Sequence, residues 1–281
     1  MNPKLCVCGG GPYTDIDCLA CAVAFAELND CAAFLPGKFN SSIPESVRKW
    51  DFKFSAELPK GAEEFVLVDF SNPNFAPHQV PLDKVIKVYD HHTGFEDYWA
   101  GRGKIEFIGA CATMIYELFE NRAPSATTAN LLYTAIFANT LNFKAAITTN
   151  RDRAAFEKLK RFTTLGPEWI RTYYSEIEKN IIANLEAAIA SDTKMFENGR
   201  LAIAQLELYD ARPILDKILP PQNGFVILVD IGGGKDYLFA GSPEIRKSLS
   251  DKLGAAFDGN IGTTDRLLLR KEIVKIMDIP R

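Results

Sequence analysis

The sequence predicts an α/β protein with an N-terminal parallel sheet, helices on both faces of that sheet, and a smaller C-terminal α/β domain. In the first part of the chain, short apolar runs alternate with helical patterns, as is typical of βαβ units and a parallel sheet. From about residue 190 the pattern changes to strand-like runs separated by turns. We therefore expect two domains, residues 1–185 and 190–281, each long enough to bury a core.

Each expected element has its own pattern. In the first domain the apolar runs KLCVC, EFVLVD and KVIKVYD predict strands at 4–8, 64–69 and 84–90. Apolar residues at helical spacing predict helices at 17–29, 110–121, 127–139, 151–162 and 167–190. In the second domain we expect strands at 201–208 and 224–231, with GGGK at 232–235 as a turn between strand-like runs.

Composition limits the possible functions. The chain has 36 acidic and 32 basic residues, so it lacks the basic excess of a general nucleic-acid-binding surface. It has no apolar run of about 18 residues to span a membrane, and its N-terminus lacks the apolar core of a signal peptide. We therefore expect a cytoplasmic protein with neither a membrane nor a nucleic acid as its partner.

Six cysteines are present, and five of them lie within the first 31 residues. Cys18 and Cys21 form a CxxC motif on an apolar, helical pattern. No second pair of cysteine or histidine residues completes a zinc set. Buried thiols are therefore favoured over a zinc or redox site.

Acidic and imidazole side chains gather at the ends of the predicted strands. They are Asp15, Asp17, Asp69, Asp90, His91 and His92. Open α/β sheets bind ligands at the carboxyl ends of their strands, and this donor set suits Mn²⁺, Mg²⁺ or Fe²⁺. Successive side chains diverge, so one histidine is expected to bind metal and the other to face substrate. Alternatively, Asp15 or Asp17 caps the helix that follows.

The order of these motifs resembles that of a known family. YDHHTGF resembles the signature of the DHH phosphoesterases. TDIDCLA, LVDFSN, YDHH and ANTLNFKAAITTNRDRAAF follow one another as in the manganese-dependent, family II inorganic pyrophosphatases and the related exopolyphosphatases. SDTKMFENGRLAIAQLE and LLLRKEIVKIM are similar to the start and end of the C-terminal DHHA2 domain of that family.

The resemblance implies a role for each matching residue. Asp15 would belong to a first metal site, Asp17 and His91 to a second, and Asp69 would bridge the two. Asp90 would orient His91, and Asn139 stands where the family has a metal-binding aspartate. The residues expected to bind phosphate oxygens are His92, Lys194, Arg270 and Lys271.

The implied activity is hydrolysis of pyrophosphate or short polyphosphate by attack of a metal-bound water in a cleft between the domains. The implied cofactor is one or two divalent ions, manganese first, with magnesium or cobalt as alternatives. A homodimer is left open.

Two positions depart from the family pattern. Gly11 stands four residues before Asp15, where the family has a histidine, and Asn139 replaces an aspartate. We considered Cys8, Tyr13 and His78 as substitutes without choosing one. These departures leave open a protein that binds a phosphorylated ligand or nucleotide without hydrolysing it.

The glycine-rich segment GGGPYT lacks the spacing of a P-loop or a dinucleotide fingerprint. The amides of Gly9–Gly11 could form an anion-binding nest beside the helix. The alternative is a tight turn from strand to helix.

Overall fold

The computed structural model describes residues 4–120 and 122–280, which form two compact units. The first unit contains the chain up to Phe143 together with Ile147–Ile170, and the second contains Lys144–Ala146 and the chain from Arg171. The boundary expected between residues 185 and 190 thus differs from the division after Ile170. That division lies inside the helix α6 (Trp169–Ala183), where no break in the sequence pattern marks it.

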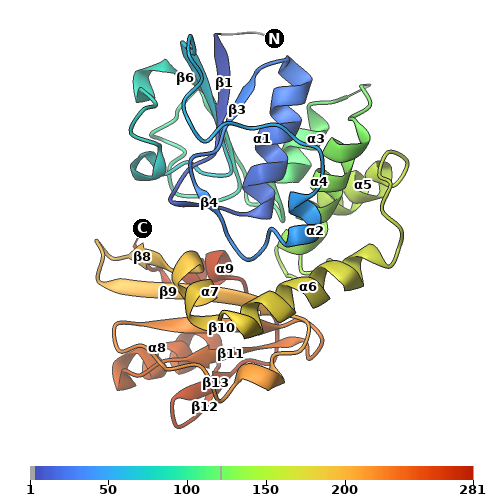
Figure 1. The fold of residues 1–281 in the computed structure, drawn as a ribbon. Helices are drawn as coiled ribbons and strands as arrows, with labels where there is room; N and C mark the ends of the chain where they lie inside the picture. The colour runs from blue at the N-terminus through green and yellow to red at the C-terminus, as the bar shows by residue number, and fades with distance from the viewer. Residues whose placement is uncertain (1–3, 121, 281) are drawn as a thin grey trace. The chain divides into compact units, whose positions relative to one another are not determined.

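The first unit is built on a five-stranded sheet in the order β3-β1-β5-β6-β7 (Figure 1). All neighbouring strands in it are parallel. Its strands are β1 (Leu5–Cys8), β3 (Ala32–Phe34), β5 (Glu64–Val68), β6 (Val85–Asp90) and β7 (Gly103–Ile105). A separate pair of two-residue parallel strands, β2 (Tyr13–Thr14) and β4 (Lys38–Phe39), follows the first glycine-rich turn.

Helix α1 (Ile16–Asn29) packs on β1, β3 and β5, and its residues from Ile16 to Phe25 are all buried. Alanine and cysteine dominate this stretch, and their small side chains let α1 be covered on several sides. The helices that pack with it or with each other are α3 (Cys111–Glu117), α4 (Ala126–Asn139) and α5 (Asn150–Leu159). The remaining helix of this unit before α6 is the short α2 (Glu45–Arg48).

A second layer of core involves loop segments. Phe70, Val80 and Trp99 cluster with Cys6 and Leu67, and Trp99 donates its indole N–H to the carbonyl of Ser71 at 2.6 Å. The 3₁₀ turns Pro73–Phe75 and Leu82–Lys84 lie in this part of the chain. The predicted α/β fold class, with its parallel sheet and flanking helices, is confirmed.

The structure corrects one expected helix. Residues 167–190 were expected to form a single helix, but they form α6 and α7 (Leu185–Asp192). Asn184 separates them with backbone angles φ −137° and ψ 46°, outside the helical range. The other expected helices and strands are present within a few residues of their expected ends, and residue 121 of the expected helix 110–121 lies outside the described residues.

The second unit has a six-stranded mixed sheet in the order β12-β13-β11-β10-β9-β8. Its strands are β8 (Lys194–Phe196), β9 (Leu201–Leu208), β10 (Gly224–Asp230), β11 (Lys235–Phe239), β12 (Ala256–Asp258) and β13 (Ile261–Thr263). Only β9 and β10 pair in parallel among them. The GGGK turn joins β10 to β11 as predicted, and its Gly234 has φ +69°. Helices α8 (Pro243–Leu253) and α9 (Arg270–Met277) pack together, and Arg212–Ile214 is a 3₁₀ turn.

All six cysteines are free and buried, as expected for structural thiols. Across residues 4–120 and 122–280, we find no helix with the length and apolar character needed to cross a membrane.

Candidate metal centre

The candidate site lies where the strand order of the parallel sheet reverses. The chain runs from β1 through α1 to β3 on one side, and later to β5 on the other side of β1. Asp15 and Asp17 follow β1, Asp69 follows β5, and His91 and His92 follow β6. Such a switch point is where open α/β sheets bind ligands, so the topology brings these strand-end residues to one edge.

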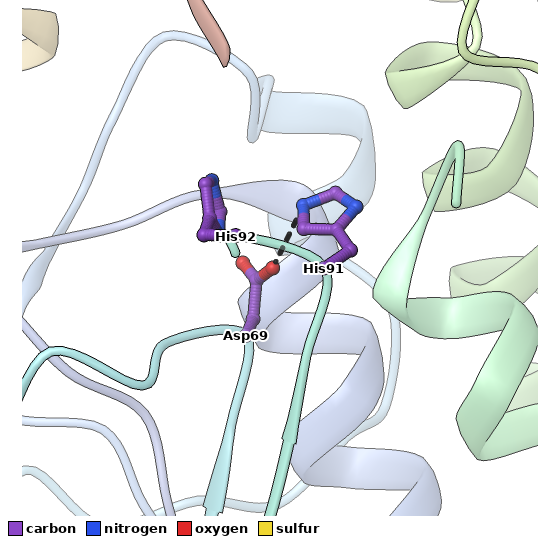
Figure 2. Close-up of side chains that lie close together, drawn as sticks. All are labelled: Asp69, His91 and His92. Atoms are coloured by element: carbon purple, nitrogen blue, oxygen red, sulfur yellow. Dashed lines mark ion pairs between the residues drawn. The ribbon is translucent and has the colours of Figure 1, made fainter. Parts of the chain in front are cut away.

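Asp69 has a left-handed backbone, with φ +65°, immediately after the last residue of β5. Its N–H still donates to the carbonyl of Tyr89 in β6 at 2.8 Å, so the hydrogen bonding between β5 and β6 continues through Asp69. Figure 2 shows His91 and His92 on either side of the Asp69 carboxylate. These three side chains each offer a ligand atom, and the three atoms lie within 4.8 Å of one another. Residues in sparsely populated backbone conformations cluster at functional sites, so this conformation beside convergent polar groups motivates a functional hypothesis for Asp69.

The buried ring of His91 is oriented by backbone. Its Nδ1 lies 3.1 Å from the carbonyl oxygen of Gly109, and because a carbonyl only accepts, Nδ1 carries the proton. Its Nε2 lies 3.3 Å from Asp69 Oδ1 and 3.7 Å from Asp17 Oδ2. In this tautomer Nε2 directs a lone pair toward two carboxylates, the arrangement of a metal ligand.

Asp17 is fully buried in the first turn of α1 and also caps α3. Its two carboxylate oxygens accept the N–H groups of Cys111 at 2.9 Å and Ala112 at 2.8 Å. Burial raises the pKa of its carboxyl to about 7, with Asp69 adding to the rise and His91 opposing it. A divalent cation would favour the ionised form of such a group.

Asp90 orients His92 rather than His91, contrary to what the resemblance implied. Asp90 Oδ1 accepts the backbone N–H of His92 at 3.0 Å and faces its Nδ1 at 2.8 Å. An aspartate commonly folds back onto the residue two positions later in this way, which places Asp90 beside the second histidine. The two imidazole rings meet edge to face, with planes at 88° and centroids 4.5 Å apart.

Asp15 caps α1, as the alternative interpretation of the sequence allowed. Its Oδ1 accepts the N–H of Cys18 at 2.9 Å. Its carboxylate also contributes to raising the pKa of Asp17, so the two negative charges interact. Capping uses one carboxylate oxygen and leaves the ligand role of Asp15 as a prediction.

The two positions that depart from the family pattern have distinct local structures. Asn139 is the last residue of α4, and its Nδ2 donates to the carbonyl of Ala135 at 3.3 Å. Gly11 has φ +73°, and a Cβ built there would come no closer than 3.7 Å to another atom. There is room for a side chain at Gly11, but in a backbone conformation that favours glycine.

The glycine-rich segment bends at Gly11 and Pro12 between β1 and β2. The N–H of Gly9 donates to the carbonyl of Phe34 at 3.1 Å, and the N–H of Gly11 donates to the carbonyl of Phe75 at 2.8 Å. A Cβ at Gly9 would lie 2.4 Å from the sulfur of Cys18. Two of the three amides that an anion nest would need are therefore used within the protein.

No family model matches the chain, but curated relatives do. A probable manganese-dependent inorganic pyrophosphatase of Lactobacillus delbrueckii is 29% identical over 206 residues, which are 70% of this chain and 63% of that protein. The manganese-dependent inorganic pyrophosphatase of Methanocaldococcus jannaschii is 29% identical over 232 residues, 74% of this chain and 73% of the relative.

The chain resembles the manganese-dependent inorganic pyrophosphatases.

Two solved structures extend the resemblance to the fold. The match with a putative family II inorganic pyrophosphatase of Methanococcus jannaschii spans 98% of this chain and 98% of that chain, with a TM-score of 0.74 and 22% identity. An exopolyphosphatase-related protein of Bacteroides fragilis covers 98% of this chain and 91% of its own, with a TM-score of 0.54 and 14% identity. The resemblance predicted from the motifs is confirmed, and at these identities the structures establish the fold.

The second unit of this pyrophosphatase-like chain carries the cations expected to bind phosphate. Lys194 opens β8, and Arg270 and Lys271 open α9. Arg270 Nη1 donates to the carbonyl of Asp192 at 2.7 Å and also to its carboxylate, which fixes the guanidinium. The role of these three cations in binding stays a prediction.

The sequence did not predict the acidic groups near Arg270 and Lys271, which are Asp192 and Glu207. Burial and then Asp192 raise the pKa of Glu207 to about 7, while Gln205, Lys271 and Arg270 lower it. Gln205 and Glu207 are polar residues two apart in the strand LAIAQLEL, so they share one face of β9. Two polar residues on one face of an otherwise apolar strand are the sequence signal that could have indicated this polar cluster.

Sequence reasoning also missed Gly109 and Asp152. Gly109 supplies the carbonyl that orients His91, and Asp152 is a fully buried carboxylate. The signal for Asp152 was a capping box, since it stands three residues after Thr149 at the start of α5.

Proposed function

We propose that this protein is a divalent-metal-dependent hydrolase of phosphoanhydride bonds, with pyrophosphate or short polyphosphate as its substrate. The observation that carries the proposal is His91, whose Nε2 faces Asp17 and Asp69 at the switch point of the sheet. The sequence similarity to manganese-dependent pyrophosphatases supports the same reaction class and manganese as the metal.

The donor set fits such an ion. Asp17, Asp69 and His91 would hold it, with Asp15 as a further carboxylate, and oxygen with imidazole donors suits Mn²⁺, with Mg²⁺ or Co²⁺ as alternatives. Burial, and after it repulsion from Asp69 and Asp15, raises the pKa of Asp17, and a cation bound beside these carboxylates would relieve the repulsion. When bound, divalent ions in such sites activate water and stabilise phosphoryl oxygens.

The other proposed roles belong to side chains that bind and orient substrate. Asp90 orients the His92 ring through its Nδ1, and His92 offers a ring nitrogen to the cluster with Asp69 and His91. The resemblance assigns phosphate binding to His92 in the first unit and to Lys194, Arg270 and Lys271 in the second. Arg270 is suited to this role because its contacts with Asp192 fix its position before substrate binds.

Phosphate release from pyrophosphate, tripolyphosphate and nucleotides, with Mn²⁺, Mg²⁺ or Co²⁺, tests the proposal. We expect turnover of pyrophosphate or tripolyphosphate with Mn²⁺, and a loss of at least about 100-fold in His91→Ala, because removing a ligand weakens metal binding and charge stabilisation together. His78→Ala is the matched control, since His78 is exposed in a loop. Absence of turnover with every substrate and metal would contradict the proposal.

A second candidate is a protein that binds phosphate or a nucleotide on the same scaffold without hydrolysing it. Gly11 and Asn139 favour it, because glycine offers no ligand and the Asn139 amide is directed to its own helix. This candidate predicts binding of pyrophosphate or a nucleotide without turnover, and a gain of hydrolysis in the double variant Gly11→His, Asn139→Asp.

We expect the gain in the double variant to be limited, because histidine at φ +73° is strained by roughly 1 kcal/mol or more. Calorimetry of pyrophosphate binding beside the phosphate-release assay separates the two candidates. Wild-type turnover equal to that of the double variant would rule out the binding protein.

A further inference from the structure

We propose that Asp152 is the positioning residue of His91, acting through the peptide group between Gly109 and Ala110. One peptide plane carries both contacts. Its C=O accepts from His91 Nδ1 at 3.1 Å, and its N–H, on Ala110, donates to Asp152 Oδ1 at 3.3 Å. A buried carboxylate thus acts on the imidazole through a polarised amide instead of touching the ring. The inference rests on the proposed metal site.

Asp152 is held in place by donors on three segments. Its Oδ2 accepts the N–H and O–H of Thr149 at 2.7 and 2.8 Å and the N–H of Gly109 at 3.2 Å. Its Oδ1 also accepts the hydroxyl of Thr113 at 2.7 Å. The side chain is fully buried, so these donors are what stabilise its charge. The carboxylate therefore fixes the segment before α3 to the start of α5.

Gly109 makes this approach possible. A Cβ at that position would lie 2.7 Å from Asp152 Oδ2 and 2.6 Å from the Cγ2 of Thr140. Any larger residue would push the carboxylate away from the peptide. The glycine is required here for close packing, since its φ is not in the left-handed range.

The physical effect is on the lone pair of Nε2. A carboxylate that accepts the amide N–H increases the negative charge on the carbonyl of the same peptide, because hydrogen bonds in a chain polarise one another. The stronger carbonyl acceptor holds the proton on Nδ1 and makes Nε2 a better ligand, as direct carboxylate partners do for other metal-binding histidines. The two adjacent histidines are therefore oriented by two buried aspartates, Asp90 by direct contact and Asp152 through a peptide.

The wild-type protein gives a first test that needs neither metal nor a variant. Nitrogen-15 NMR of the three histidines, at a pH about two units above the ordinary histidine pKa of about 6.5, reports which ring nitrogen carries the proton. We expect His91 to be protonated at Nδ1. A predominant Nε2–H form of His91 would overturn the inference, whatever the protein catalyses.

Variants give the second test. In Asp152→Asn, both carboxylate oxygens, which accept hydrogen bonds, are replaced by one carbonyl oxygen and one NH₂ group, and the NH₂ group must face N–H or O–H donors. The Gly109–Ala110 peptide also loses its charged partner. We expect Mn²⁺ affinity, measured by calorimetry, to fall by about 10- to 100-fold, and His91 to populate both tautomers. A folded Asp152→Asn protein with wild-type affinity and a single Nδ1–H tautomer would contradict the inference.

Two controls separate positioning from stability. Thr149→Ala removes the capping hydroxyl but leaves the contacts of Asp152 with Gly109 and Ala110, so it should lower stability without changing the tautomer. Asp236→Asn removes an equally buried carboxylate in the second unit and should leave both Mn²⁺ affinity and tautomer unchanged. Failure of wild-type protein to bind Mn²⁺ would refute the proposed metal site, while the tautomer would still test the contact.

Discussion

Asp15 combines two roles at the scale of a single residue, and one substitution can separate them. Its Oδ1 caps α1, and its carboxylate is a proposed metal ligand. Serine caps helices about as well as aspartate but brings no charge. We expect the free energy of unfolding of Asp15→Ser in metal-free buffer to differ from that of wild type by no more than about 0.5 kcal/mol. We expect its Mn²⁺ affinity to be lower by about 10-fold or more.

Urea denaturation and calorimetric Mn²⁺ titration measure the two quantities. Asp15→Ala is the companion variant, because it removes cap and charge together and should also cost about 1 kcal/mol of stability. Wild-type Mn²⁺ affinity in Asp15→Ser would show that Asp15 is a cap and not a ligand.

The sequence predicted which residues gather at the site but not how they pair. The positions of Asp17, Asp69 and His91 after predicted strands indicated that they would lie together, because parallel strands end at one edge of a sheet. The pairing of Asp90 with His92 depended on a local fold-back, and the orientation of His91 depended on a carbonyl 18 residues away. Backbone carbonyls carry no sequence signal, so such a contact cannot be deduced from residue types.

At the scale of elements, long patterns were predicted well and short strands were missed. Helices α1 and α4 and the strand β9 match their expected ranges within one residue. The three-residue strands β3, β7, β8, β12 and β13 were not anticipated, because three residues are too few to show a period of two. The break at Asn184 was missed because the helix propensity of asparagine is below that of alanine by less than about 0.7 kcal/mol, too little to signal a helix end by itself.

At the scale of the whole molecule, a buried carboxylate of the second unit should make stability depend on pH. Asp236 is fully buried, and its Oδ1 finds no hydrogen-bond partner within residues 4–120 and 122–280. Burial raises the pKa of its carboxyl to about 8; the N–H of Leu268 opposes the rise, and Glu272 and Glu207 add to it. The folded protein thus keeps a proton that the unfolded chain releases above about pH 4.

The sign follows from that difference in bound protons. Between about pH 4 and pH 8 the folded state binds more protons than the unfolded state, so this group lowers stability as pH rises, by at most ~1.4 kcal/mol per pH unit. Asparagine has no proton to lose. We expect Asp236→Asn to gain stability relative to wild type between about pH 5 and pH 8, by a few kcal/mol.

Urea unfolding of both proteins at several pH values measures the effect. Other titrating groups are common to the two proteins, so they cancel in the difference between the curves. A stability difference that does not change with pH would mean that Asp236 is ionised in the folded protein across this range.

The path of the chain has a consequence for dividing the protein. Leu141, Asn142 and Phe143 all have positive φ and form a turn after α4. The next three residues belong to the second unit, where the Lys144 amine donates to the carbonyl of Ile231 at 2.7 Å, before the chain returns to the first unit. A fragment beginning at Arg171 would therefore lack three residues of its own unit, Lys144–Ala146. Neither unit can be produced whole by a single cut, so both have to be studied within the intact polypeptide.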